Sequence, residues 1–313
     1  MRKYSLGFAG LFMTLGLLLS SCNRDNNPQN TQSLTANKEA ETAITTEFAT
    51  FKAKEANDFC SVELTIDYPT KGELVFLDSV RSWINNYLSR DAFSWEDGKL
   101  KKYRGDLSDG EKLVKHYAKS QLKTDFDEDE KEFLREMGTG YECSHTANAT
   151  FKGEQITSML LTTYLYSGGA HGGIISETAT FNNNSGKRIG WEIFKDKRKV
   201  KAHIVKGLMK YFEVNDKQSL EECLFLTLEE LPLPATMPYF SEQGVVLLYD
   251  QYEIAPYAAG TPMDVITWKE CEDYLAPEFW EMIKNDVEPS STEKADKKER
   301  KRDERDNPFR MLQ

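Results

Sequence analysis

Residues 160–173 read Leu-Leu-Thr-Thr-Tyr-Leu-Tyr-Ser-Gly-Gly-Ala-His-Gly-Gly, and this stretch decides the interpretation of the chain. Its first half is apolar on both faces and rich in Thr and Tyr, which is typical of a strand buried in the middle of a sheet. Its second half places glycines around His171, and glycine permits positive φ and close approach of another backbone. The stretch therefore predicts a central strand that ends in a tight loop carrying an imidazole.

Residues 245–260 have the same organisation. They begin with Val-Val-Leu-Leu-Tyr, which predicts a second buried strand, and continue through Glu253 into Pro256 and Tyr257. Proline stiffens that loop and tyrosine gives it an aromatic tip. We expect the loops at 167–173 and 253–260 to lie near each other, at one end or edge of the sheet.

Working outward, period-two alternation predicts further strands at 58–68, 141–152, 155–166, 174–182 and 265–268. Helical periodicity predicts helices at 38–55, 74–90, 109–122, 127–137, 197–212, 219–230 and 268–284. Helices and antiparallel strands interleave without a βαβ repeat, so the predicted fold class is α+β, a mostly antiparallel sheet with helices packed on it. We place two sequential subdomains at 38–140 and 141–284.

The N-terminus predicts export. Residues 1–21 hold a short positive region and an apolar run that is shorter than a transmembrane helix requires, as in a signal peptide. Leu19-Ser20-Ser21-Cys22 looks like a bacterial lipobox, which implies acylation of Cys22, palmitate included, and tethering to an envelope membrane, the outer one where there is one. An ordinary signal peptide with a chance cysteine is the alternative. Residues 22–37 are polar, as in a flexible tether, and residues 285–313 predict a charged, disordered tail.

Charge narrows the range of partners. The 313 residues carry a net charge of −11, which argues against nucleic acid and anionic lipid as ligands. An acidic surface favours a cationic partner, although plain solubility explains the same charge.

Four cysteines follow Cys22 in the chain. Cys60 and Cys143 fall on the inward faces of predicted strands, which favours the disulfide Cys60–Cys143 and leaves Cys223–Cys271 as the second. Buried free thiols are the alternative, since cysteine often behaves as a small hydrophobic residue.

Three features together resemble a known family. They are residues 166–172 around His171, the turn Ser185-Gly186-Lys187 that leads into Trp191-Glu192-Ile193-Phe194, and residues 244–260. Together they resemble the extracellular domain of RsiV-type proteins, the lysozyme-binding anti-sigma factors, a domain also found in envelope lipoproteins and beside peptidoglycan deacetylase domains. Residues 59–88 resemble the domain that precedes it there. This chain shows neither a sigma-binding segment nor a deacetylase motif, so the resemblance implies the fold and a lysozyme- or glycan-related surface only.

The candidate chemistry leaves alternatives open. His171 suits a general base or a ligand-binding imidazole, but no nucleophile motif adjoins it. A structural role, in which the imidazole caps a tight connection formed by the glycines, is the alternative. Glu253 suits catalysis, yet no second carboxylate is identifiable, so we favour a buried carboxylate that accepts backbone N–H groups and shapes its loop. Tyr257 suits recognition, with a plug in the core as the alternative.

Acidic residues at 125–136 approach an EF-hand pattern, but Glu130 stands where the loop needs glycine. The acidic start of a helix is the simpler interpretation. His116, His145 and His203 are scattered, which indicates structural roles, and we expect no metal and no cofactor.

The sequence thus predicts an exported lipoprotein that binds rather than catalyses. Its partners would be the membrane, through the lipid anchor, and a lysozyme-like or other cationic protein or peptidoglycan. A peptidoglycan-acting hydrolase and a structural lipoprotein are the alternatives. The ligand-binding candidates are Ser167, Gly168, Gly169, His171, Glu253, Pro256 and Tyr257.

Overall fold

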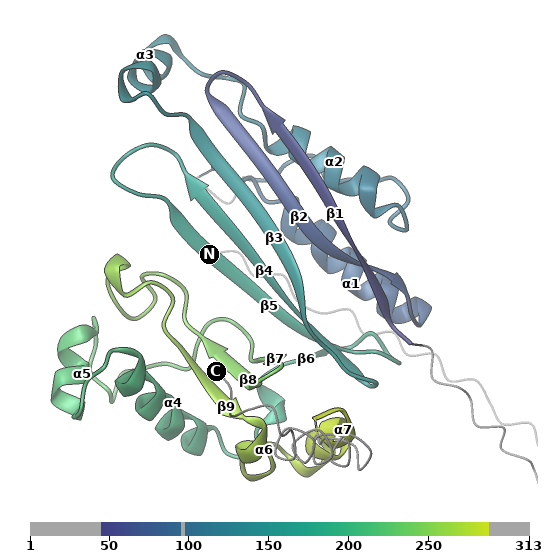
Figure 1. Cartoon of the computed structure of the whole chain (residues 1–313), viewed down its shortest axis with the longest axis vertical. Helices are drawn as coiled ribbons and strands as arrows, with labels where there is room; N and C mark the ends of the chain where they lie inside the picture. The colour runs from purple at the N-terminus through teal and green to yellow at the C-terminus, as the bar shows by residue number, and fades with distance from the viewer. Residues whose placement is uncertain (1–44, 95–97, 288–313) are drawn as a thin grey trace, which may run out of the picture. The chain divides into compact units, whose positions relative to one another are not determined.

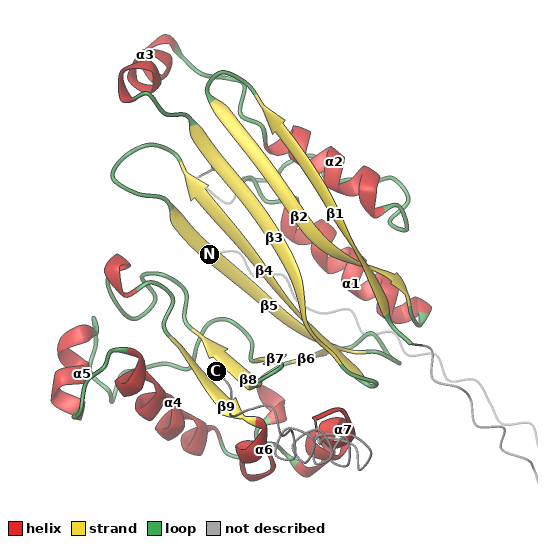
Figure 2. Ribbon diagram, viewed as in Figure 1, coloured by secondary structure: helices red, strands yellow, loops and turns green. Residues whose placement is uncertain are grey.

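The computed structural model describes residues 45–94 and 98–287, all within the compact unit Ala43–Gln313. The first sheet contains β1 Glu47–Ala56, β2 Cys60–Lys71, β3 Tyr141–Lys152, β4 Ile156–Tyr166, β5 Gly173–Asn182 and β6 Arg188–Ile189. The second sheet contains β7 Tyr239–Ser241, β8 Gly244–Leu248 and β9 Met263–Thr267. The helices are α1 Leu74–Leu88, α2 Gly110–Gln121, α3 Glu128–Met137, α4 Lys197–Tyr211, α5 Lys217–Cys223, α6 Trp268–Tyr274 and α7 Pro277–Val287, with 3-10 turns η1 Trp191–Ile193 and η2 Tyr257–Ala259. The predicted α+β class is confirmed (Figure 2).

The large sheet has the strand order β1-β2-β3-β4-β5-β6 (Figure 1). Neighbouring strands are antiparallel except β2 and β3, which run parallel. Helices α1, α2 and α3 lie between these two strands in sequence and supply the long crossover that a parallel pair requires. The sheet therefore combines strands from both sides of residue 140. The placing of subdomains at 38–140 and 141–284 stays a prediction.

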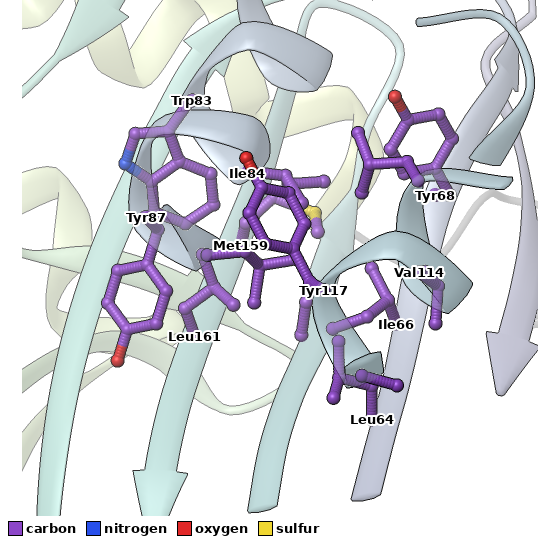
Figure 3. Close-up of a cluster of buried hydrophobic side chains, with 14 of the residues drawn as sticks. Leu64, Ile66, Tyr68, Trp83, Ile84, Tyr87, Val114, Tyr117, Met159 and Leu161 are labelled. Carbon is purple, nitrogen blue, oxygen red and sulfur yellow. The ribbon is translucent and has the colours of Figure 1, made fainter. Parts of the chain in front are cut away.

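Helices α1 and α2 cover one face of this sheet. Phe76, Val80, Ile84 and Leu88 recur at four-residue spacing on α1 and are all fully buried. Figure 3 shows Ile84 of α1 and Tyr117 of α2 beside inward side chains of the strands, among them Met159. Full burial of each such side chain contributes about 1.5–3 kcal/mol, so this cluster fixes α1 on the sheet.

The second sheet packs against the opposite face of β4. Leu160 contacts the cluster of Tyr239, Val246 and Leu248, while its neighbour Leu161 belongs to the helix-covered core. Successive side chains of a strand point to opposite faces, so β4 is covered on both sides. The predicted central, doubly buried strand is confirmed. Helix α4 packs on β9, and the two elements contribute to a second hydrophobic core that lies apart from the one under α1 and α2.

The helix predicted at 38–55 is wrong in its described part, because residues 47–56 form the strand β1. Phe51 faces inward, with its ring 6.1 Å from that of Tyr68, while Lys52 and Lys54 face solvent. Ladder pairing with the whole of β2 overrides the modest helical pattern. Two predicted helices also differ in extent: α5 ends at Cys223, and the last helix is divided before Pro277, a residue that starts helices but does not continue them.

Neither predicted disulfide is present, since the structure has Cys60, Cys143, Cys223 and Cys271 as free thiols. In the parallel ladder Cys60 pairs with Tyr141, and Cys143 pairs with Val62, so the two cysteines are offset by two residues. Sheet geometry then separates their Cα atoms by about 8 Å, beyond the reach of a disulfide. The Cys223 and Cys271 thiols instead donate to the Ser219 and Ile266 carbonyls.

The signal peptide, Cys22, the tether, residues 38–44 and residues 288–313 of the predicted tail lie outside the described residues. Helix α7 continues through Val287, and the Asp286 carboxylate accepts the Glu154 N–H at 3.0 Å. Within the part of the chain that the structure describes, no helix is both long and apolar enough to cross a membrane.

Candidate functional site

The two loops singled out in the sequence meet in the structure. The His171 imidazole lies on the Tyr257 ring, with centroids 3.6 Å apart and planes 12° from parallel. The Tyr252 ring lies 6.0 Å from that of Tyr257. We call these three side chains the aromatic rim. The loops follow β4 and β8, which belong to different sheets, so the expectation that one sheet carries both is wrong, although their proximity is confirmed.

Glycines shape the first loop. Gly168 and Gly169 have φ of +89° and +91°, a region that side chains with a Cβ rarely adopt. The Tyr166 hydroxyl donates to the Gly169 carbonyl at 3.0 Å and closes the bend. A Cβ at Gly172 would lie 2.5 Å from the Tyr164 ring, so the backbone must pass close to that ring to bring His171 to Tyr257.

Glu253 shapes the second loop. Its Oε1 accepts the Ala235 N–H at 2.7 Å and its Oε2 accepts the Asp250 N–H at 2.9 Å. This half-buried carboxylate therefore has the backbone-accepting role favoured from the sequence. The turn that it closes holds Tyr252 at φ +63°, in the left-handed region. Tyr252 is nevertheless 55% exposed.

The same turn is attached to the edge of β5. Strand β6 pairs only with Thr180 and Phe181, so the first half of β5 has no strand on its outer side. There the Ile174 N–H donates to Gln251 Oε1 at 2.7 Å, and the Ser176 N–H donates to Asp250 Oδ1 at 2.8 Å. Burial raises the pKa of the Asp250 carboxyl. Two side chains thus take the place of a neighbouring strand and hold the turn beside the glycine loop.

A cavity of about 1000 Å³ opens beside the rim. It lies where α1 has ended, on the face of the sheet that this helix covers, and His171 and Tyr252 are among its lining residues. Ile175, 61% exposed, adds an apolar group from β5. Arg90 and Lys99, joined by an antiparallel bridge, line it from the segment that follows α1.

Hydrogen-bonded side chains form the buried floor of the cavity. The Thr163 hydroxyl lies 2.8 Å from the Tyr87 hydroxyl and 2.7 Å from His145 Nδ1. His145 Nε2 lies 3.3 Å from Cys143 Sγ. Burial lowers the pKa of His145 to about 4 and raises that of Tyr87 to about 12, so both groups are neutral near pH 7. Burial also raises the pKa of Cys143 to about 12, which disfavours a thiolate.

Arg90 is held at the cavity wall by a charged pair. Its guanidinium donates to the Glu177 carboxylate at 2.6 Å, and the Trp83 indole N–H donates to the other oxygen of Glu177 at 2.7 Å. The guanidinium also lies 5.0 Å from the centre of the Tyr87 ring. These contacts leave most of the Arg90 charge compensated.

The predicted site residues have different positions. Ser167, Gly168 and His171 line the cavity. Tyr257 is half-buried in the rim rather than a plug in the core, and Pro256 is exposed at the start of η2. Sequence reasoning missed the lining residues of other elements, which include Tyr87, Arg90, Asp91, Lys99, His145, Thr163, Ile175, Gln251 and Tyr252. The only sequence signal for Gln251 and Tyr252 was a polar turn directly after a buried strand.

The other candidates have structural roles. Asp127 caps α3 in a capping box with Glu130, which confirms the acidic helix start. Among residues 45–94 and 98–287, no group of three or more His, Cys, Asp or Glu side chains is placed to hold a metal ion. His203 lies between two carboxylates, 2.6 Å from Asp264 Oδ2 and 3.5 Å from Glu270 Oε1, away from the cavity lining. The contact with Asp264 raises the pKa of His203.

Comparison with known proteins finds a family model that matches part of the chain. Residues 192–269 match the DUF3298 family. That family is described as a protein of unknown function, and the matched residues run from η1 into α6 and include the 253–260 loop. A crystal structure of a DUF3298 family member from Bacteroides fragilis is similar, with a TM-score of 0.55 and 17% identity over 77% of this chain and 98% of that chain. A DUF3298 protein from Pseudomonas aeruginosa matches with a TM-score of 0.44 and 14% identity, over 75% of this chain and 95% of that one. No curated protein sequence matches. At 17% identity the similarity to the Bacteroides fragilis structure shows the fold alone.

Proposed function

We propose that this chain is a binding module of the bacterial cell envelope, anchored to a membrane through an acylated Cys22, and that it recognises its ligand at the aromatic rim. One observation carries the proposal: the stacking of His171 on Tyr257 joins two shaped loops at the mouth of an open cavity. Rigid aromatic groups at such a mouth contribute contact area with little loss of conformational entropy on binding.

The geometry favours recognition over catalysis. Both carboxylate oxygens of Glu253 accept backbone N–H groups, so this side chain shapes the turn and does not face a substrate. His171 Nδ1 lies 3.1 Å from the Gly172 carbonyl, and its ring stacks on Tyr257. The Cys143 thiol is buried and its pKa is raised, which is the opposite of what an attacking thiolate requires.

A lysozyme-like cationic protein is the ligand we propose first. The resemblance to RsiV-type domains suggests it, and the net charge of −11 would attract a cationic partner over long range. In this proposal the exposed Pro256 and the rim form the centre of the contact, where rigid aromatic groups contribute most of the affinity.

Isothermal titration of the full-length chain in detergent with lysozyme tests this proposal. We expect binding that weakens as salt concentration rises. Tyr257→Ala should weaken it at least tenfold, whereas Tyr257→Phe should retain it. Leu74→Ala, which removes a 76% exposed side chain from the far end of α1, is the matched control and should bind like the unmodified chain. Absence of binding by the unmodified chain, or equal affinities for Tyr257→Ala and Leu74→Ala, would contradict the proposal.

A further inference from the structure

The cavity beside the aromatic rim is larger than a surface contact requires. Its volume of about 1000 Å³ is at the upper end of the range for sites that enclose small ligands. A protein that bound only the exposed rim would leave this space to solvent. The lining of the cavity can therefore be compared with the chemistry of small ligands.

The lining residues fall into two groups of different character. The two loops and β5 supply Tyr252, His171 and the exposed Ile175. The segment after α1 supplies Lys99 and Asp91, whose Oδ1 accepts the Phe93 N–H at 3.0 Å and whose second oxygen, without a partner among the residues that the structure describes, is left for a ligand. A sugar ring matches both groups of lining residues. Its C–H faces pack on aromatic rings, and its hydroxyl groups form hydrogen bonds with charged donors and acceptors.

Charge argues against the other common classes of ligand. A nucleotide or another polyphosphate would require several uncompensated positive charges, but Glu177 compensates Arg90 at 2.6 Å, and Lys99 shares the lining with the Asp91 carboxylate. An acyl chain would require an apolar enclosure, but Asp91 and Lys99 line this one. The floor of Tyr87, Thr163 and His145 is neutral, hydrogen-bonded and polar. An uncharged, hydroxyl-rich ligand fits the compensated charge of Arg90, the polar lining at Asp91 and Lys99, and the neutral floor.

The backbone at Tyr252 supplies an independent observation. A tyrosine at φ +63° lies in the left-handed region, which costs free energy relative to an ordinary conformation, and glycine would remove that cost. The Tyr252 ring is 55% exposed, so burial offsets little of the cost. Strain that holds an exposed aromatic ring over a cavity indicates a role in binding.

We infer that the cavity binds a short segment of a glycan, with one sugar ring packed on Tyr252 and its hydroxyl groups bonded to Asp91 and Lys99. The inference deepens the proposed function, because it rests on a binding role for the same site, but it does not depend on lysozyme as the partner. Tyr252, which belongs to the rim and to the cavity lining, would then take part in both contacts, whereas Asp91 and Lys99 would contact the glycan alone.

The test is calorimetric and saturation-transfer NMR titration of the full-length chain in detergent with chitotriose, cellotriose and maltotriose. We expect saturable binding of at least one trisaccharide. Tyr252→Ala and Asp91→Asn should each weaken it at least tenfold, Tyr252→Phe should weaken it less than threefold, and Leu74→Ala should leave it unchanged. Tyr252→Gly removes the ring together with the strain, so it should lose binding without any fall in melting temperature.

Three results would overturn the inference: no saturable signal with any of the trisaccharides, equal affinity of the unmodified chain and Tyr252→Gly, or equal affinity of the unmodified chain and Asp91→Asn. Lysozyme titrated into the same preparations separates the two proposals. Binding of lysozyme without any trisaccharide defeats only the glycan inference. Binding of a trisaccharide without lysozyme supports the glycan inference and removes lysozyme as the partner.

Discussion

Glu253→Ala tests the role of the carboxylate that holds the second loop. The change removes the acceptors of two backbone N–H groups, those of Ala235 and Asp250, at 2.7 and 2.9 Å. A hydrogen bond to a charged group contributes about 1.5–3 kcal/mol when buried, and less where solvent screens it. Because Glu253 is half-buried, we expect the free energy of unfolding to fall by about 2–4 kcal/mol in total.

The assay is urea denaturation followed by tryptophan fluorescence, with the slope against urea concentration compared between variants. Glu253→Gln is informative as well, because its amide NH2 would oppose one of the two N–H donors, and we expect about half of the loss or more. Exposed Glu242 provides the matched control, since Glu242→Ala should change stability by no more than about 0.5 kcal/mol. If Glu253→Ala costs no more than Glu242→Ala, the carboxylate does not shape the turn.

Three further predictions follow from individual contacts, and a fourth follows from the lipobox at Cys22. The pKa of His203 is raised in the folded state, so its contribution to stability is fully present below the unfolded pKa of about 6.5 and is lost as pH rises through the folded pKa. The free energy of unfolding, measured from pH 5 to 9, should show this loss. A curve for His203→Gln that runs parallel to that of the unmodified chain would refute the prediction. Gly172→Ala places a Cβ 2.5 Å from the Tyr164 ring and should cost about 1–3 kcal/mol, so an unchanged melting temperature would show that the loop yields freely. Tyr87→Phe removes the hydrogen bond to Thr163 and should cost about 0.5–1.5 kcal/mol in urea denaturation, whereas no loss would mean that the floor is not hydrogen-bonded as described. Cys22→Ala should abolish incorporation of labelled fatty acid and release the protein from the membrane fraction, and an unlabelled wild type would defeat the lipoprotein proposal.

The sequence was most informative where a local pattern and tertiary burial agree. The strand at Ile156–Tyr166 and the helix at Leu74–Leu88 were predictable because their apolar spacing is the spacing that the core requires. The strand Glu47–Ala56 was mispredicted because its pairing with the neighbouring strand is a tertiary effect that helical propensity does not contain. The prediction of the disulfide Cys60–Cys143 was wrong because two side chains that both face the core can still be offset along their strands by the register of the ladder.

The candidate site was predictable in part. The glycine loop and the role of Glu253 could be inferred because tight turns have local chemical requirements. The cavity could not be inferred, since Arg90, Thr163 and Tyr252 come from three separate elements and meet only through the packing of α1 and the turn on the sheet. The positive φ of Tyr252 could not be predicted either, because tyrosine rarely adopts the left-handed conformation.

Hydrogen–deuterium exchange of the full-length chain with and without lysozyme tests the central claim, recognition at the aromatic rim, most directly. The account predicts slower exchange in peptides that cover residues 167–173 and 251–260, and unchanged exchange at the start of α1 around Leu74. The claim is contradicted if lysozyme alters exchange only outside these two loops, or alters it nowhere.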